Sequence, residues 1–120
     1  VSPDVAEQWK KGNVWIEPKE TKYELVLVCS MFCQPCIPAT QYLYEKLKPI
    51  ARKLCDAGLH VRKELVEFSE IDWRERYNIL SVPTLILLKD GKEVKRWVGW
   101  NPELYEQALK EVVRLAEGEE

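Results

Sequence analysis

Residues 22–40 read KYELVLVCSMFCQPCIPAT, and the fold can be worked out from this stretch. Residues 22–30 are β-branched and nearly continuous in apolar side chains, which predicts a short strand buried on both faces. A long helix is predicted over residues 34–57, where one apolar stripe is formed by Leu43, Leu47, Ile50 and Leu54. Cys33 and Cys36 therefore lie between a buried strand and the start of a helix.

Proline, glycine and capping residues set the expected limits of the next elements. Pro49 lies inside the long helix, where it should produce a kink, and Gly58 is suited to end that helix. Residues 60–68 are predicted to form a strand. Ser69, with Asp72 three residues later, resembles a capping box, which predicts a short helix that ends at about residue 78.

The C-terminal part is predicted to contain a hairpin followed by a helix. Strands are expected over residues 84–88 and 93–98, joined by a turn that contains Asp90-Gly91, because both of these residues can adopt positive φ. Asn101-Pro102 is a typical helix start, an N-cap followed by proline at the first position, and an apolar stripe continues to about residue 116.

The first twenty residues are predicted to form an N-terminal extension. Ser2-Pro3-Asp4 is suited to cap a short helix that runs to about Lys11 and ends at Gly12. Residues 14–16 can form a short strand, and residues 18–22 are polar and read as a loop. We therefore expect a helix and a strand ahead of the main domain.

This order of elements predicts an α/β fold. A strand–helix–strand unit implies a parallel strand pair, and the hairpin adds an antiparallel pair. We expect a mixed central β-sheet of four to five strands with helices on both faces. The length of 120 residues suits a single domain, with a core at about residues 22–116 and an extension at about residues 1–21.

Composition excludes several functional classes. The formal net charge is -2, whereas electrostatic nucleic-acid binding needs a basic excess, so no nucleic-acid partner is expected. No apolar run approaches the roughly 20 residues that span a bilayer, so no membrane association is expected. No signal-peptide pattern opens the chain, and we expect a cytoplasmic protein.

Cys33-Gln34-Pro35-Cys36 has the composition and position of a redox-active dithiol. A thiol at a helix N-terminus meets unpaired N–H groups and the positive end of the helix dipole, and both favour the thiolate. We expect Cys33 to be the exposed attacking thiol and Cys36, one helical turn further on, to be the buried resolving thiol. The same spacing also matches half of a zinc site, so a metal- or cluster-binding module is the alternative.

Three landmarks make the chain resemble the thioredoxin superfamily. They are the Cys33–Cys36 motif, the Val82-Pro83-Thr84 segment before a strand, and Gly99 after the hairpin. The resemblance covers residues 22–116 and implies the thioredoxin fold and thiol–disulfide oxidoreductase activity, with no resident cofactor. It also implies a cis peptide bond before Pro83 and pairing of the Val82 backbone with an extended substrate.

The resemblance further implies how the protein would work with others. Protein disulfides would be the substrates, a reductase would supply electrons, and the chain would act as a monomer. The substrate-binding residues that we expect beside the two cysteines are Phe32, Gln34, Pro35, Val82, Pro83, Gly99 and Trp100. A second alternative is a peptide-docking module of the same fold, in which the redox role is secondary.

The sequence departs from the thioredoxin pattern at three places. Phe32 replaces a tryptophan, and Gln34 replaces the glycine of the usual Gly-Pro pair. Leu27 replaces a buried acid that is thought to assist the proton transfers of the second thiol. Glu64 can substitute for that acid if the strand register places it opposite Leu27, whereas a one-residue slip places Lys63 there; a solvated glutamate is the simpler interpretation.

Two more cysteines and one histidine need an interpretation. Cys29 shares strand parity with Leu25 and reads first as a buried free thiol, although the Cys29–Cys33–Cys36 spacing resembles an iron–sulfur motif. A bond between Cys29 and Cys55 is conceivable, but a reducing compartment argues against it. His60 has no Cys or His neighbour at a zinc-site spacing. Core or shelf positions are expected for three tryptophans, Trp73, Trp97 and Trp100.

Overall fold

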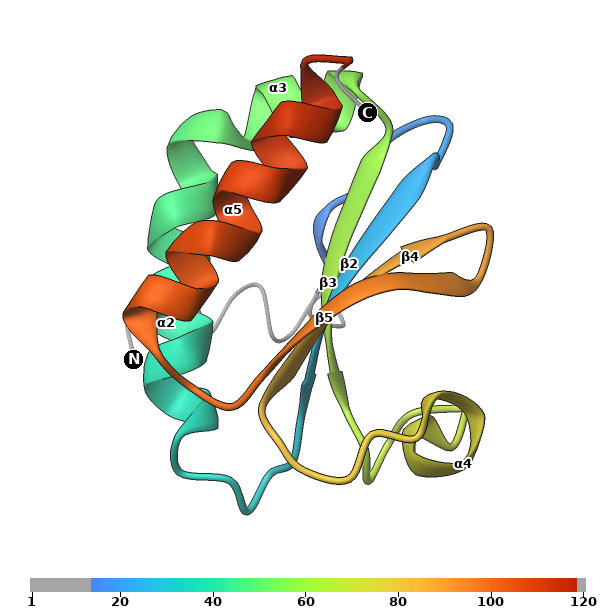
Figure 1. The fold of residues 1–120 in the computed structure, drawn as a ribbon, viewed down its shortest axis with the longest axis vertical. Coiled ribbons are helices and arrows are strands. Elements are labelled where there is room, and N and C mark those ends of the chain that lie inside the picture. The colour runs from blue at the N-terminus through green and yellow to red at the C-terminus, as the bar shows by residue number, and fades with distance from the viewer. Residues whose placement is uncertain (1–13, 119–120) are drawn as a thin grey trace.

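The computed structural model describes residues 14–118, which form a five-stranded sheet with helices on both faces (Figure 1). The strand order is β1-β3-β2-β4-β5. The strands are β1 (Val14–Ile16), β2 (Tyr23–Cys29), β3 (Leu59–Leu65), β4 (Thr84–Lys89) and β5 (Lys92–Val98). The helical elements are α2 (Cys36–Leu47), η1 (Lys48–Ile50), α3 (Ala51–Asp56), α4 (Trp73–Tyr77) and α5 (Pro102–Ala116). The helix predicted before Gly12 lies outside the described residues.

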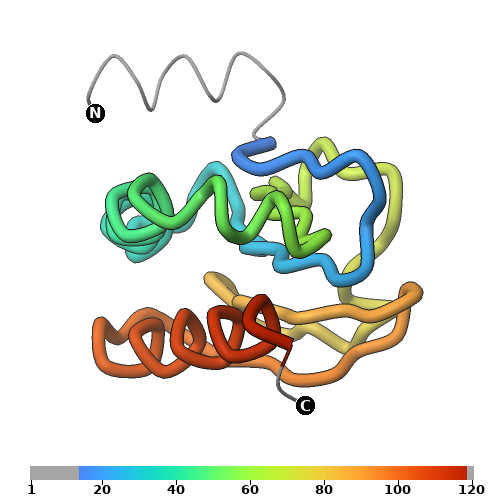
Figure 2. The backbone as a smooth tube through the Cα atoms, turned by 90° about the horizontal axis from the view of Figure 1, so that it is seen from above, coloured from blue at the N-terminus to red at the C-terminus, as the bar shows by residue number. Residues whose placement is uncertain are grey.

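The sheet is mixed, as the order of elements predicted. β2 and β3 run parallel, and the antiparallel pairs are β1–β3, β2–β4 and β4–β5. Side chains alternate between the two faces of β2, so that Leu25 and Leu27 pack with α2, α3 and α5, whereas Val26 packs with Trp73 of α4. Figures 1 and 2 show α2, α3 and α5 as one layer, and Figure 1 shows α4 apart from them on the other side of the sheet.

The long predicted helix is interrupted near its middle. α2 ends at Leu47, a 3₁₀ segment contains Pro49, and α3 continues from Ala51. Proline has no N–H and its ring clashes with the preceding turn, so the helix is interrupted at the position where a kink was predicted, and it forms two helices instead of one kinked helix. Gly58 follows with φ of 84°, which confirms it as the residue that ends this helical stretch.

The region after β3 differs from its prediction in two details. The strand ends at Leu65, since a turn follows in which the Phe68 and Ser69 N–H groups both donate to the Leu65 carbonyl. Ser69 is not the helix cap. Asp72 caps α4 by accepting from the N–H groups of residues 74 and 75, while Ser69 accepts a hydrogen bond of 2.9 Å from the Trp73 indole.

The hairpin and the last helix match their predictions closely. Asp90 and Gly91 have φ of 54° and 78°, so both turn residues adopt the positive φ that the hairpin requires. Asn101 accepts hydrogen bonds from the N–H groups of Glu103 and Leu104 and is the cap of α5. These two features fix the direction in which the chain leaves the β4–β5 edge of the sheet.

Candidate active site

Cys33 and Cys36 form a disulfide where the chain passes from β2 to α2. Their Cα atoms are 5.4 Å apart, within the usual range for a disulfide. The Cys33 side chain is half-buried, whereas Cys36 is only 3% exposed and belongs to the core cluster under α2. The two sulfurs therefore differ in their access to solvent.

Few backbone N–H groups at the start of α2 are available to the disulfide. Pro35 and Pro38 have no N–H, and the Ile37 N–H donates to the Gln34 carbonyl at 3.1 Å. The first turn of α2 contains no acidic residue that would offset the positive end of the helix dipole. The positive end of the α2 dipole would therefore favour a thiolate at Cys33.

The short loop before Cys33 is held by a chain of hydrogen bonds that sequence reasoning missed. The Cys33 N–H donates to the Ser30 carbonyl at 3.1 Å, and the Phe32 N–H donates to Ser30 Oγ at 3.2 Å. The Met31 N–H donates to Glu67 Oε1 at 3.0 Å, and Ser30 Oγ donates to Glu67 Oε2. The hydrogen bond from Ser30, and then that from Met31, lowers the pKa of Glu67.

The second predicted landmark has the geometry that the family resemblance implied. The Val82–Pro83 peptide bond is cis. Pro83 is buried, Val82 is half-buried, and the Gly99 N–H donates to the Pro83 carbonyl at 2.8 Å, so the structure joins the Pro83 and Gly99 landmarks directly. Val82, like Cys33, packs against the core cluster on the α2 face of the sheet.

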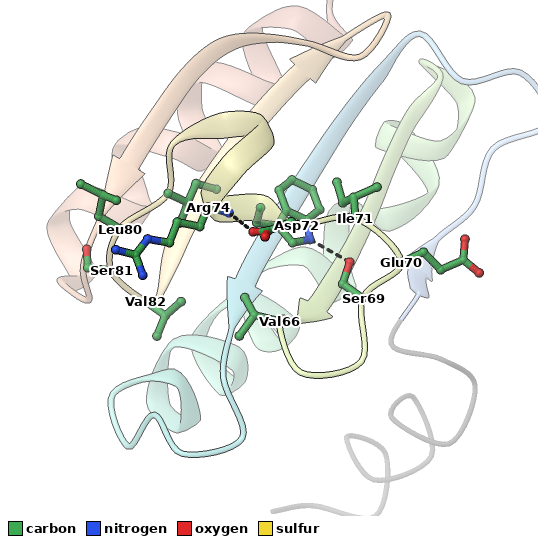
Figure 3. A pocket seen from close by; sticks show the side chains of 11 residues that line it. Val66, Ser69, Glu70, Ile71, Asp72, Arg74, Leu80, Ser81 and Val82 are labelled. Atoms are coloured by element: carbon green, nitrogen blue, oxygen red, sulfur yellow. Dashed lines mark hydrogen bonds between the residues drawn. The ribbon is translucent and has the colours of Figure 1, made fainter.

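Exposed apolar side chains gather at this end of the molecule. Phe32 is 81% exposed and Met31 56%, and the other large exposed apolar residues here include Ile37, Val66, Phe68 and Leu80. A cavity of about 470 Å³ opens between the β3–α4 loop and residues 79–82 (Figure 3). Val66 and Val82 both line this cavity. Exposed apolar side chains therefore occur on the β2–α2 connection, on the first turn of α2 and on the loops before and after α4.

The three tryptophans that were singled out differ in burial. Trp73 and Trp97 are buried, as predicted. Trp100 is half-buried and makes edge-to-face contacts with Tyr42 of α2 and Tyr105 of α5, at centroid distances of 5.6 Å and 5.1 Å. Tyr105 was not singled out from the sequence, although its spacing from Ala108 and Val112 places it on the buried stripe of α5.

The register of β2 and β3 decides what lies opposite Leu27. Leu27 is paired with Lys63, which is 7% exposed, so the suggestion that Glu64 replaces the missing acid is wrong. Glu64 is paired with Val28, points to the other face, and accepts a hydrogen bond of 3.0 Å from Arg62. Burial lowers the pKa of Lys63, and the nearby Cys29 raises it by a smaller amount.

The two remaining cysteines are free thiols. Cys29 is completely buried, and burial raises its pKa to about 12, while Lys63 and Thr40 act in the opposite direction. This confirms Cys29 as a buried thiol and excludes the conceivable bond to Cys55.

Among residues 14–118, no group of three or more His, Cys, Asp or Glu side chains is arranged to hold a metal ion. No helix in that range is long and apolar enough to cross a bilayer.

Comparison with known proteins identifies thioredoxins as relatives. The chain is 39% identical over 69 residues to thioredoxin from Chlamydia trachomatis, a match to 57% of this chain and 60% of that protein. It is 33% identical over 91 residues to thioredoxin from Alicyclobacillus acidocaldarius, covering 75% of this chain and 81% of that protein. Thioredoxin-2 from Pyricularia oryzae is 31% identical over 85 residues, which is 70% of this chain but 45% of the relative. The chain therefore covers only about half the length of the Pyricularia oryzae relative and 60% of the Chlamydia trachomatis relative. No protein-family model matches the chain.

Solved structures show the same fold. Thioredoxin from Fasciola hepatica superposes with a TM-score of 0.61 at 22% identity, over 88% of this chain and 89% of that chain. Mitochondrial thioredoxin 3 from Saccharomyces cerevisiae, in its oxidised form, has the same TM-score and identity over 78% of this chain and 81% of its own. The predicted fold class is therefore confirmed.

Proposed function

Because the chain belongs to the thioredoxin family, we propose that it is a thiol–disulfide oxidoreductase that reduces protein disulfides. The observation that carries this proposal is the Cys33–Cys36 disulfide at the start of α2, in which Cys33 is accessible and Cys36 is buried. If the two thiols had the same role, they would not need different exposure. A two-step exchange needs one accessible thiol and one buried thiol. The nucleophile has to reach a partner, and the resolving thiol has to wait out of its reach.

The exchange proceeds in two balanced steps. The Cys33 thiolate attacks one sulfur of the substrate disulfide, forms a mixed disulfide, and releases the other substrate sulfur as a thiolate. Cys36 then loses its proton and attacks Cys33 Sγ, which restores the Cys33–Cys36 disulfide and releases the second substrate sulfur. Two electrons pass from the protein to the substrate, which takes up two protons, and an upstream reductase returns the Cys33–Cys36 pair to the dithiol form.

The apolar surface beside Cys33 supports a binding site for an extended segment of the substrate protein. Phe32, Gln34 and Pro35 would contact the segment from the motif side, and Gly99 and Trp100 would border it from the loop after β5. The backbone of Val82, before the cis Pro83, would pair with the substrate chain. Removing apolar area of this kind from water favours association, and the cost of ordering the substrate segment offsets part of that gain.

We place this activity in the cytoplasm, with the protein acting as a monomer. A reducing compartment suits a dithiol that donates electrons, and it is also consistent with the two free cysteines, Cys29 and Cys55. A size-exclusion measurement with light scattering tests the monomer, because a dimer would have twice the mass of 14.1 kDa.

An equilibrium redox titration tests the proposal. The protein is incubated in thiol–disulfide buffers, free thiols are trapped, and the fraction of the Cys33–Cys36 disulfide is read by mass. A reduction potential near the thioredoxin value of about -270 mV supports a reductant. A potential near -120 mV would instead indicate an oxidant. Failure to form an intramolecular disulfide would overturn the proposal and leave the metal-binding and peptide-docking alternatives.

Single cysteine variants separate the two roles. Cys33→Ser should abolish reduction of insulin disulfides. Cys36→Ser should accumulate a mixed disulfide with the substrate, because the second step is missing. Cys55→Ser is the matched control, since Cys55 lies far from the motif on α3, and it should keep full activity. Equal loss in the control would contradict the assignment.

A further inference from the structure

We infer that Glu67 is a positioning residue for the nucleophile, since it anchors the loop that carries Cys33. This inference rests on the proposed function, because it takes Cys33 to be the nucleophile. The hydrogen bonds of Glu67 are observed in the structure whatever the function is. Figure 1 shows that the β2–α2 connection and the β3–α4 connection leave the same end of the sheet, so a side chain from one can reach the other. Glu67 and its partners Ser30 and Met31 are more than 30 residues apart in the chain.

The loop has little apolar packing to hold it in place. Met31 is 56% exposed and Phe32 81%, so neither buries enough surface to fix the backbone between β2 and Cys33. Its position must therefore depend on polar contacts. The N–H groups of residues 31, 32 and 33 all have acceptors, and these acceptors are Glu67 Oε1, Ser30 Oγ and the Ser30 carbonyl.

Glu67 is the end of this network. Its second oxygen accepts from Ser30 Oγ, which orients the hydroxyl so that its lone pairs face the Phe32 N–H. Without the carboxylate, the Ser30 hydroxyl can rotate and the Met31 N–H loses its acceptor. The loop then gains alternative conformations, and Cys33 is less often placed at the N-terminus of α2.

Glu67 is itself held in place by the fold. A tight turn follows β3, in which the Phe68 and Ser69 N–H groups donate to the Leu65 carbonyl at 2.9 Å. The Val66 N–H donates to the Cys29 carbonyl at 2.9 Å, which extends the pairing of β3 with β2 up to the residue before Glu67. The carboxylate is thus presented by backbone that is fixed on both sides.

Charge and position act in opposite directions on Cys33, and this makes the inference testable. A carboxylate near a thiolate disfavours it by repulsion, so removing the charge alone should make Cys33 more reactive. Loss of the anchor should make Cys33 less reactive, because the sulfur leaves the helix N-terminus more often. Glu67→Gln removes the charge but keeps both contacts, since its amide oxygen accepts from Met31 and its amide nitrogen donates to Ser30 Oγ.

The experiment measures the alkylation rate of Cys33 in the reduced protein by iodoacetamide between pH 5 and 9, with Glu67→Ala, Glu67→Gln and Ser30→Ala. A network of exposed hydrogen bonds is worth about a factor of two to ten, so Glu67→Ala should slow Cys33 at pH 7 by that factor and move the pH profile to higher pH. Ser30→Ala should act in the same direction. Glu67→Gln keeps both contacts and removes the charge, so it should react as fast as the unmodified protein or up to about twofold faster.

The control is Glu45→Ala, which removes one exposed carboxylate from the same helix that carries the motif and should leave the profile unchanged. If Glu67→Ala and Glu67→Gln both react faster than the unmodified protein, Glu67 acts only through its charge and the inference is overturned. If all variants match the control, Glu67 has no role at Cys33. Alkylation of Cys33 needs no disulfide substrate. If the unmodified protein failed to reduce insulin disulfides, the proposed function would be refuted, but the alkylation rates would still show whether Glu67 positions Cys33.

Discussion

Cys29 should resist alkylation in the folded protein, although it lies four residues from Cys33. It is completely buried, and burial raises its pKa to about 12. The reacting species is the thiolate, so this pKa makes Cys29 inert at the pH values at which ordinary thiols react. The oxidised protein is suited to the test, because Cys29 and Cys55 are its free thiols.

The expected size of the effect follows from ionisation. At pH 8, a thiol with a pKa of about 12 is ionised to about one part in 10⁴, whereas an exposed thiol with a pKa of about 8.5 is ionised to about one quarter. Ionisation alone therefore slows Cys29 by roughly 2,000-fold relative to an exposed thiol of a small peptide. Exclusion of the reagent from the core slows it further.

The assay counts alkylated thiols by mass after timed exposure of the oxidised protein to iodoacetamide at pH 8. One thiol, the half-buried Cys55, should react in native buffer, and Cys29 should react only after guanidinium unfolds the protein. Peptide mapping identifies the modified residue. Alkylation of Cys29 in native buffer within tenfold of the peptide thiol would refute the reasoning, because it would mean that β2 is not buried as the sheet places it.

Three further changes test the packing and the charges. Leu43→Ala removes a completely buried side chain of α2 and should lower the free energy of unfolding by about 3 to 5 kcal/mol, measured by urea denaturation. Gly91→Ala places a side chain at φ of 78° with open space around it, so only backbone strain remains, about 1 kcal/mol by the same measurement; no change would show that the turn relaxes. Lys63→Met tests a pH dependence. The pKa of Lys63 is lowered in the fold, so the unfolded chain binds more protons, and the unmodified protein should gain stability relative to Lys63→Met as the pH rises from its lowered pKa towards 10.5. A constant difference between pH 7 and 10 would contradict this.

Local signals in the sequence were sufficient for most elements of the fold. The continuous apolar run of β2, the Asp90-Gly91 turn and the Asn101-Pro102 helix start each encode their structure within a few residues, and each was confirmed. The break at Pro49 was predictable for the same reason, because a missing N–H acts on its own turn. Ser69 was the exception among the caps. Ser69 and Asp72 both have side chains that can cap a helix. In the structure the Trp73 indole donates to Ser69 Oγ, and Asp72 is the cap of α4.

The sequence by itself determined the order of the elements, the mixed sheet and the position of the dithiol between a strand and a helix. Only the tertiary structure decided which side chains meet across the sheet. The register placed Lys63, and not Glu64, opposite Leu27, and two separate loops brought Glu67 to Ser30. β2 is apolar at nearly every position and residues 62–64 of β3 are all charged, so neither strand has an alternation that fixes their pairing to within one residue. Contacts between residues more than 30 positions apart are chosen by the packing of the whole core, and that packing set the surroundings of Cys33.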